Sequence, residues 1–146
     1  KKIAFNCALN ALSGIWEVRN RDTIMDALKP LRRAVLREVR EVAVAAGVPL
    51  PGTDELLAEF ERRAKASNNV NSMLQDLRRG RPTEVGFLNE AILRSARSAG
   101  REALVNGTIA EWIRRLERAA DEEERAAIRV KAQTELLALA SDPGLR

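Results

Sequence analysis

The sequence predicts an all-α protein, a bundle of six or seven helices, and three observations support this prediction. Apolar residues recur every three or four positions through most of the chain, as at Leu31, Val35, Val39 and Val42. The alternating pattern typical of strands is missing. Stretches rich in Pro, Gly and Asn separate the periodic segments. The 146 residues have the length of one domain, which can bury about two thirds of its unfolded surface.

The first two helices are the most clearly marked. Residues 2–16 form the first, and the polar stretch EVRNRDT then begins a connection. A second, central helix is expected from Pro30 to Gly47, because Pro suits the first turn of a helix and Gly suits its end. Ala46 is placed on its apolar face. Residues 3–12 carry enough apolar surface that a second copy is expected to cover part of it.

The middle of the chain predicts three further helices. Thr53 or Asp54 is a candidate cap for the first of them, which carries Leu56, Leu57 and Phe60. A short helix follows the segment SNN and ends at a turn around residues 80–82. A longer helix is then expected to open at Thr83 or Glu84.

Two helices complete the prediction. The first lies in NGTIAEWIRRLERA, with Asn106 or Thr108 as its expected cap. The last lies within residues 119–146, and the run DEEE places acidic groups at the positive end of its dipole. Its expected apolar anchors are Ile128, Leu136 and Leu139.

The composition narrows the classes of function. The chain has 25 basic and 21 acidic residues, no histidine and one cysteine, Cys7, which is expected in the core. This composition argues against a metal site and against a Ser/His triad. Charges of both signs alternate and aromatics are few, so we expect no nucleic-acid partner. The chain has no apolar run near 18 residues, so no membrane segment is expected, and with one cysteine a cytoplasmic location is expected.

Two polar islands interrupt the helical pattern. Lys2, Asn6 and Asn10 lie four residues apart, so they form one stripe that drifts by about 40° per step around a helix. Ser72 and Glu84 flank a basic turn further along the chain. Each island has an ordinary interpretation as helix caps and surface ion pairs. Together they supply a cation, neutral hydrogen-bonding groups and a carboxylate, which suit a small polar anion.

The stretches KIAFNCALNAL and, about 60 residues later, NSMLQDLRRGRPTEVGFLN resemble the C-terminal domain of ketopantoate reductase. This family is also called 2-dehydropantoate 2-reductase, and its fold is the helical domain of 6-phosphogluconate dehydrogenase-like reductases. The resemblance covers residues 1–118 and leaves 119–146 as an additional C-terminal helix of a single domain, 1–146. The chain departs from the family pattern at Gly86, where Asp is common, and at Glu90, where Gly is common. The identity of the substrate therefore stays open.

The resemblance implies a role for each polar residue. Lys2 matches the general acid that protonates the alkoxide formed from the ketone. Asn6 and Asn10 match residues that bind the substrate's oxygens, and Ser72 matches a residue that binds its carboxylate. Glu84 matches a glutamate beside the nicotinamide ribose.

The resemblance also implies a substrate, a cofactor and a further domain. The family reduces ketopantoate, a 2-keto acid, to pantoate for pantothenate and coenzyme A synthesis, with NADPH held by an N-terminal Rossmann domain. That domain is absent from this sequence, so the chain is expected to be inactive alone, and a homodimer is expected. The alternatives are a helical dimerisation module without redox activity and a domain of a related 2-keto acid reductase.

Overall fold

The computed structural model describes residues 1–145 and confirms the all-α prediction. Within this range there are seven α-helices and no strand. The helices are α1 (Lys2–Trp16), α2 (Lys29–Ala45), α3 (Thr53–Lys65), α4 (Ser72–Arg78), α5 (Asn89–Ser98), α6 (Leu104–Arg118) and α7 (Glu122–Ala140). Short 3-10 turns complete the chain: η1 (Asn20–Ile24), η2 (Asp26–Leu28), η3 (Glu84–Phe87) and η4 (Pro143–Leu145).

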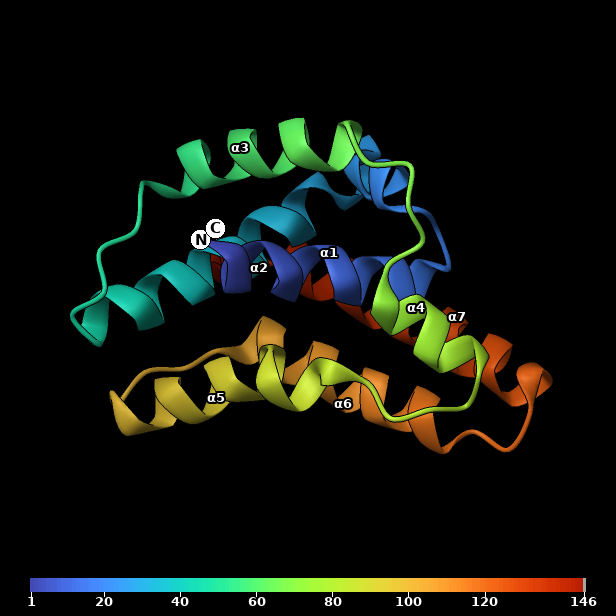
Figure 1. Cartoon of the computed structure of the whole chain (residues 1–146). Coiled ribbons are helices and arrows are strands. Elements are labelled where there is room, and N and C mark those ends of the chain that lie inside the picture. The colour runs from blue at the N-terminus through green and yellow to red at the C-terminus, as the bar shows by residue number, and fades with distance from the viewer. Residues whose placement is uncertain (146) are drawn as a thin grey trace.

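The helices stack around α1 and α2, which lie between α3 on one side and the α5–α6 hairpin on the other (Figure 1). Helix α2 contacts α1, α3, α5, α6 and α7, so its predicted central place is confirmed. Its predicted apolar positions are buried, with Leu31 and Val35 fully inaccessible. Ala46 is the exception, because it follows the last turn of α2 and is exposed. Gly47 ends the helix as predicted, with a φ of 77°.

The apolar surface of α1 is covered by the chain itself. Phe5 packs edge-on against Phe60 of α3, with the ring centroids 6.2 Å apart. Cys7 and Leu12 are fully buried, as a core position requires. Of the surface that a second copy was expected to cover, Ile3 is 56% exposed and Leu9 is half-buried. The prediction of a large uncovered face at residues 3–12 is therefore wrong.

The starts of two helices differ from the prediction. Gly52, not Thr53 or Asp54, precedes α3, and no side chain caps it. Thr83 caps only the short turn η3, where its Oγ1 accepts a hydrogen bond from the Val85 N–H at 3.2 Å. The chain then kinks at residue 88, and α5 begins at residue 89. A continuous helix from Thr83 was therefore the wrong prediction.

Helix α6 has an unexpected cap. It begins at residue 104, so Asn106 and Thr108 lie inside it and neither is its N-cap. The carboxylate of Glu38 on α2 takes that role by accepting hydrogen bonds from the backbone N–H of Val105 at 2.8 Å and of Asn106 at 2.9 Å. A group that is 67 residues away in sequence therefore satisfies the first turn of α6.

Helix α7 begins as the sequence predicts, since Asp121 accepts a hydrogen bond from the Glu124 N–H at 2.8 Å. Leu136 is fully buried and Ile128 and Leu139 are partly buried against the core. Arg129 is 4% exposed and donates to the carbonyl of Gly14 at the end of α1. The last helix is thus an integral part of the bundle. No helix among the described residues is long and apolar enough to cross a membrane.

Candidate functional site

The stripe of Lys2, Asn6 and Asn10 runs along one side of α1, as the four-residue spacing predicts. Its exposure falls along the helix. Lys2 is exposed, Asn6 is half-buried and Asn10 is only 6% exposed. The stripe therefore begins in solvent and ends near the core.

Helix α4 is attached to the helix that carries the stripe. Asn71 is its N-cap, and the Asn71 Oδ1 accepts a hydrogen bond from the Leu74 N–H at 3.1 Å. The same side chain donates from Nδ2 to the carbonyl of Leu9 at 3.4 Å, which attaches the start of α4 to α1. Ser72, the first residue of α4, is exposed and follows this attachment directly. Asn71 therefore has the capping role that the sequence left open for Ser72.

Helix α5 is attached to the same helix. Its first residue, Asn89, donates from Nδ2 to the carbonyl of Cys7 at 3.1 Å. Cys7 follows Asn6 and Leu9 precedes Asn10, so both hydrogen bonds reach the stretch of α1 between these two asparagines. Glu84 opens the turn η3 just before α5 and is exposed. The two segments that carry Ser72 and Glu84 are thus both attached to the middle of α1.

A hollow of about 130 Å³ lies between α1 and α3 beside the stripe. Lys2 and Asn6 line it from α1, and Phe60 and Arg63 line it from α3. Asn10, Ser72 and Glu84 are not among its lining residues. The hollow therefore unites two of the five predicted site residues, and the other three lie outside it.

Arg63 is a lining residue that the sequence analysis missed. Its guanidinium lies 5.0 Å from the centroid of the Phe5 ring and pairs with Glu59 one turn earlier on α3. In the sequence it is one of two adjacent arginines on a charged helix, and nothing there distinguishes it from a solvated cation. With Lys2 it places two cations and one amide around a small space, which suits a carboxylate.

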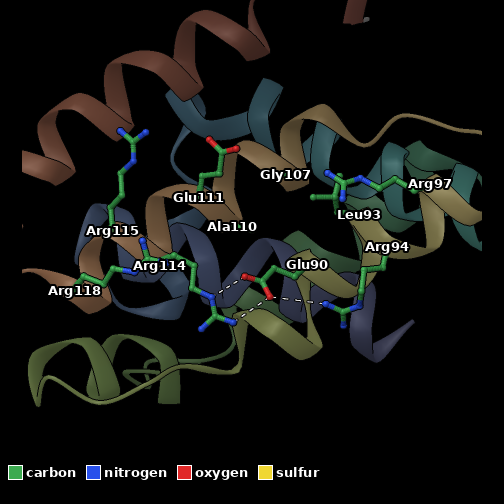
Figure 2. A pocket seen from close by; sticks show the side chains of 10 residues that line it. All are labelled: Glu90, Leu93, Arg94, Arg97, Gly107, Ala110, Glu111, Arg114, Arg115 and Arg118. Atoms are coloured by element: carbon green, nitrogen blue, oxygen red, sulfur yellow. Dashed lines mark hydrogen bonds and ion pairs between the residues drawn. The ribbon is translucent and has the colours of Figure 1, made fainter.

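A larger hollow of about 500 Å³ lies on the α5–α6 hairpin and contains none of the predicted site residues (Figure 2). It is rich in arginine. Arg114 joins both oxygens of Glu90, at 2.7 and 3.0 Å, and also donates to Glu117 at 2.9 Å. The hydrogen bonds from Arg114 lower the pKa of Glu90. Burial works to raise the pKa of Glu117, but hydrogen bonds from Arg114 and Thr83 outweigh it and lower that pKa.

This ion-pair cluster explains the departures from the family pattern at Gly86 and Glu90. A Cβ atom at position 86 would lie 3.0 Å from Nη2 of Arg114 and 3.4 Å from Oε2 of Glu90. The glycine thus leaves room for the Arg114–Glu90 pair. The two departures belong to one local arrangement, because the carboxylate at position 90 occupies space that a side chain at position 86 would need.

Comparison with known proteins places these observations in a family. The family described as "Ketopantoate reductase PanE/ApbA C terminal" matches residues 1–117. The chain belongs to this family. The resemblance seen in the sequence is thereby confirmed. The helical fold described above is that of the ketopantoate reductase C-terminal domain.

Individual relatives agree with the family assignment. A 2-dehydropantoate 2-reductase from Archaeoglobus fulgidus is 34% identical over 117 residues, which are 80% of this chain and 39% of the relative. The crystal structure of a PanE/ApbA family ketopantoate reductase from Ralstonia eutropha JMP134 superposes with a TM-score of 0.71 at 31% identity, over 80% of this chain and 39% of that one. The chain therefore spans about two fifths of the length of these relatives.

A more distant likeness is found to a dehydrogenase structure. D-mandelate dehydrogenase in complex with NADH superposes with a TM-score of 0.75 at 22% identity, over 82% of this chain and 42% of that one. At this identity the likeness concerns the fold alone. All of α7 lies beyond the residues matched by the ketopantoate reductase family.

Proposed function

We propose that this chain is the substrate-binding domain of an NADPH-dependent 2-dehydropantoate 2-reductase, which reduces ketopantoate to pantoate for pantothenate and coenzyme A synthesis. In this proposal an N-terminal Rossmann domain of a longer protein holds most of the cofactor, and residues 1–146 form one helical domain with α7 as an addition. The helical domain alone is then inactive. We also propose a cytoplasmic homodimer, as the sequence led us to expect.

The proposal rests mainly on the arrangement around α1. Hydrogen bonds attach the segments carrying Ser72 and Glu84 to α1, the helix that carries the stripe of Lys2, Asn6 and Asn10. Polar groups on helices with otherwise buried apolar faces are well suited to line a shared cleft. The family membership favours the same assignment.

In the proposed reaction, a nicotinamide bound mainly by the Rossmann domain would supply the hydride that reduces the keto carbon. Lys2 stabilises the negative charge that develops on the ketone oxygen and gives that oxygen its proton. Among the described residues no ion pair holds Lys2, whereas its neighbour Lys1 pairs with Glu59, at 3.2 Å.

The other site residues bind and orient in this proposal. Asn6 and Asn10 donate hydrogen bonds to the substrate's hydroxyl and neighbouring oxygens, and the Ser72 hydroxyl binds its carboxylate. Glu84 accepts a hydrogen bond from a ribose hydroxyl, a role that fits its exposed carboxylate at the start of η3.

The decisive experiment measures NADPH oxidation by the complete protein with ketopantoate. Lys2→Ala should lower kcat by about 100-fold or more, because general-acid and electrostatic help is typically of this size. Lys1→Ala is the matched control, since it removes the same side chain from the neighbouring position and should keep kcat. Ser72→Ala should mainly raise KM for ketopantoate.

The same assay tests the alternatives. A wild-type enzyme that prefers a 2-keto acid other than ketopantoate would identify a related reductase, for which the altered pair Gly86 and Glu90 is the supporting observation. A complete protein without activity on any 2-keto acid would contradict the proposal and favour an interaction module. Unchanged kcat in Lys2→Ala would exclude the lysine as proton donor.

A further inference from the structure

Four helices are joined by one buried chain of hydrogen bonds that the proposed reaction does not use. Glu38 of α2 accepts a bond from Nδ2 of Asn106 on α6, at 2.8 Å, in addition to the two backbone bonds described above. Oδ1 of Asn106 accepts from Nδ2 of Asn89 on α5, at 3.0 Å. Nδ2 of Asn89 also donates to the carbonyl of Cys7 on α1. Each of the three polar side chains is at most 4% exposed.

The carboxylate at one end of this chain sets the direction of every bond. A carboxylate only accepts, so the Nδ2 group of Asn106 must face Glu38 and its Oδ1 must face Asn89. Asn89 must then present its Nδ2 group to both Asn106 and Cys7, since the flipped amide would set oxygen against two oxygens. The orientation of Asn89 is therefore fixed by its surroundings.

Asn89 leaves one polar atom without a partner. Its Oδ1 is buried and has no hydrogen-bond partner among the described residues. Such an atom destabilises the folded protein, so an apolar side chain would suit this position better if only packing mattered. The two bonds from Nδ2 are thus the property that distinguishes asparagine from an apolar residue here.

Asn89 stands at the junction between the two polar islands. The turn η3 ends two residues before it, and the Leu88 N–H donates to the carbonyl of Glu84 at 3.1 Å. Its acceptor on α1, Cys7, lies between Asn6 and Asn10. A hydrogen bond from Asn89 to the Cys7 carbonyl therefore connects the segment of Glu84 to the part of α1 that carries Asn6 and Asn10.

We propose that Asn89 is a positioning residue that holds Glu84 at a fixed place relative to Asn6 and Asn10, with its amide oriented by Asn106 and Glu38. The inference rests on the proposed function, in which Glu84 faces the cofactor and the stripe faces the substrate. A displacement of about 1 Å between reacting groups can lower rates by about 100-fold. Asn89 thus affects the reaction without touching either reactant.

The kinetic test compares Asn89→Ala with Leu136→Ala in the complete protein. Both remove a buried side chain, but Leu136 belongs to α7 and makes neither of the hydrogen bonds of the Asn89 amide. We expect Asn89→Ala to lower kcat with ketopantoate by roughly tenfold to 100-fold. Leu136→Ala should keep kcat at temperatures where it is folded. Equal loss of kcat in the two variants would overturn the positioning role.

A second measurement does not depend on reductase activity or on turnover. Hydrogen exchange in the 146-residue chain should become faster at residues 84–88 in Asn89→Ala, by about tenfold, while α3 and α7 keep their rates. Uniformly faster exchange would mean general destabilisation and would contradict the inference. If exchange changes locally but the wild-type complete protein does not reduce ketopantoate, the proposed function fails and the attachment of η3 to α1 stands.

Discussion

Lys1 and Lys2 have the same side chain and different surroundings. Lys1 pairs with Glu59 of α3, whereas Lys2 faces the hollow that Asn6 and Arg63 also line. Lys1 precedes the helix as its N-cap residue, whereas Lys2 is the first residue of α1. The role of a charged residue near this site is thus set by its position on the helix rather than by its type.

Cys7 should be chemically inert in the folded protein. Burial raises the pKa of its thiol to about 12, so the reactive thiolate is nearly absent at neutral pH. We expect no alkylation by iodoacetamide at pH 8 over the time in which the urea-unfolded chain reacts fully. The check is mass spectrometry of both samples. Rapid labelling of the native chain would mean that α1 opens readily from the core.

Single residues also mark the limit of prediction from sequence. The spacing of Lys2, Asn6 and Asn10 was sufficient to place them on one stripe, because helix geometry is local. Arg63 could not be foreseen, since its place beside Lys2 depends on how α3 packs against α1. Side chains brought together by packing are visible only in the fold.

At the scale of elements, η3 and the α5–α6 hairpin are coupled through Gly86, Glu90 and Arg114. We expect Gly86→Asp to destabilise the protein by about 1 kcal/mol, because its Cβ would crowd Nη2 of Arg114. The double variant Gly86→Asp/Glu90→Gly should recover part of this loss, since it removes the carboxylate that competes for the same space. Urea unfolding of the two single variants and of the double variant measures the coupling energy between positions 86 and 90.

A coupling energy of about 0.5 kcal/mol or more would support this arrangement. Additive losses within error would show that positions 86 and 90 are independent. Gly52→Ala is a suitable comparison, because a Cβ atom there meets nothing within 4 Å.

Helix interiors were predictable from the sequence and helix starts were less so. Apolar periodicity located the bodies of α2, α3 and α7, and the local cap at Asp121 was recognisable. The start of α6 was not, because its cap comes from Glu38 on another helix. The break before α5 was missed as well, since η3 is fixed by contacts with α5 and α6.

On the scale of the whole molecule, α7 extends the bundle beyond the residues that the family matches. We expect Leu136→Ala to lower the free energy of unfolding by about 2–5 kcal/mol, as is typical of a buried leucine. Val130→Ala, at a position on the same helix that is 63% exposed, should change it by less than about 0.5 kcal/mol. Urea denaturation of both variants is the measurement. If both variants changed the free energy of unfolding by similarly small amounts, α7 would only lie on the surface of the bundle.

The capping of α6 by Glu38 has a consequence for synthesis on the ribosome. Glu38 is made 67 residues before Val105, its first partner on α6. Until α6 leaves the exit tunnel, the carboxylate must remain in water, because burying it without partners is costly. Helix α2 therefore cannot close its contacts with α5 and α6 early, and the nascent domain has to wait for its second half before it completes its core.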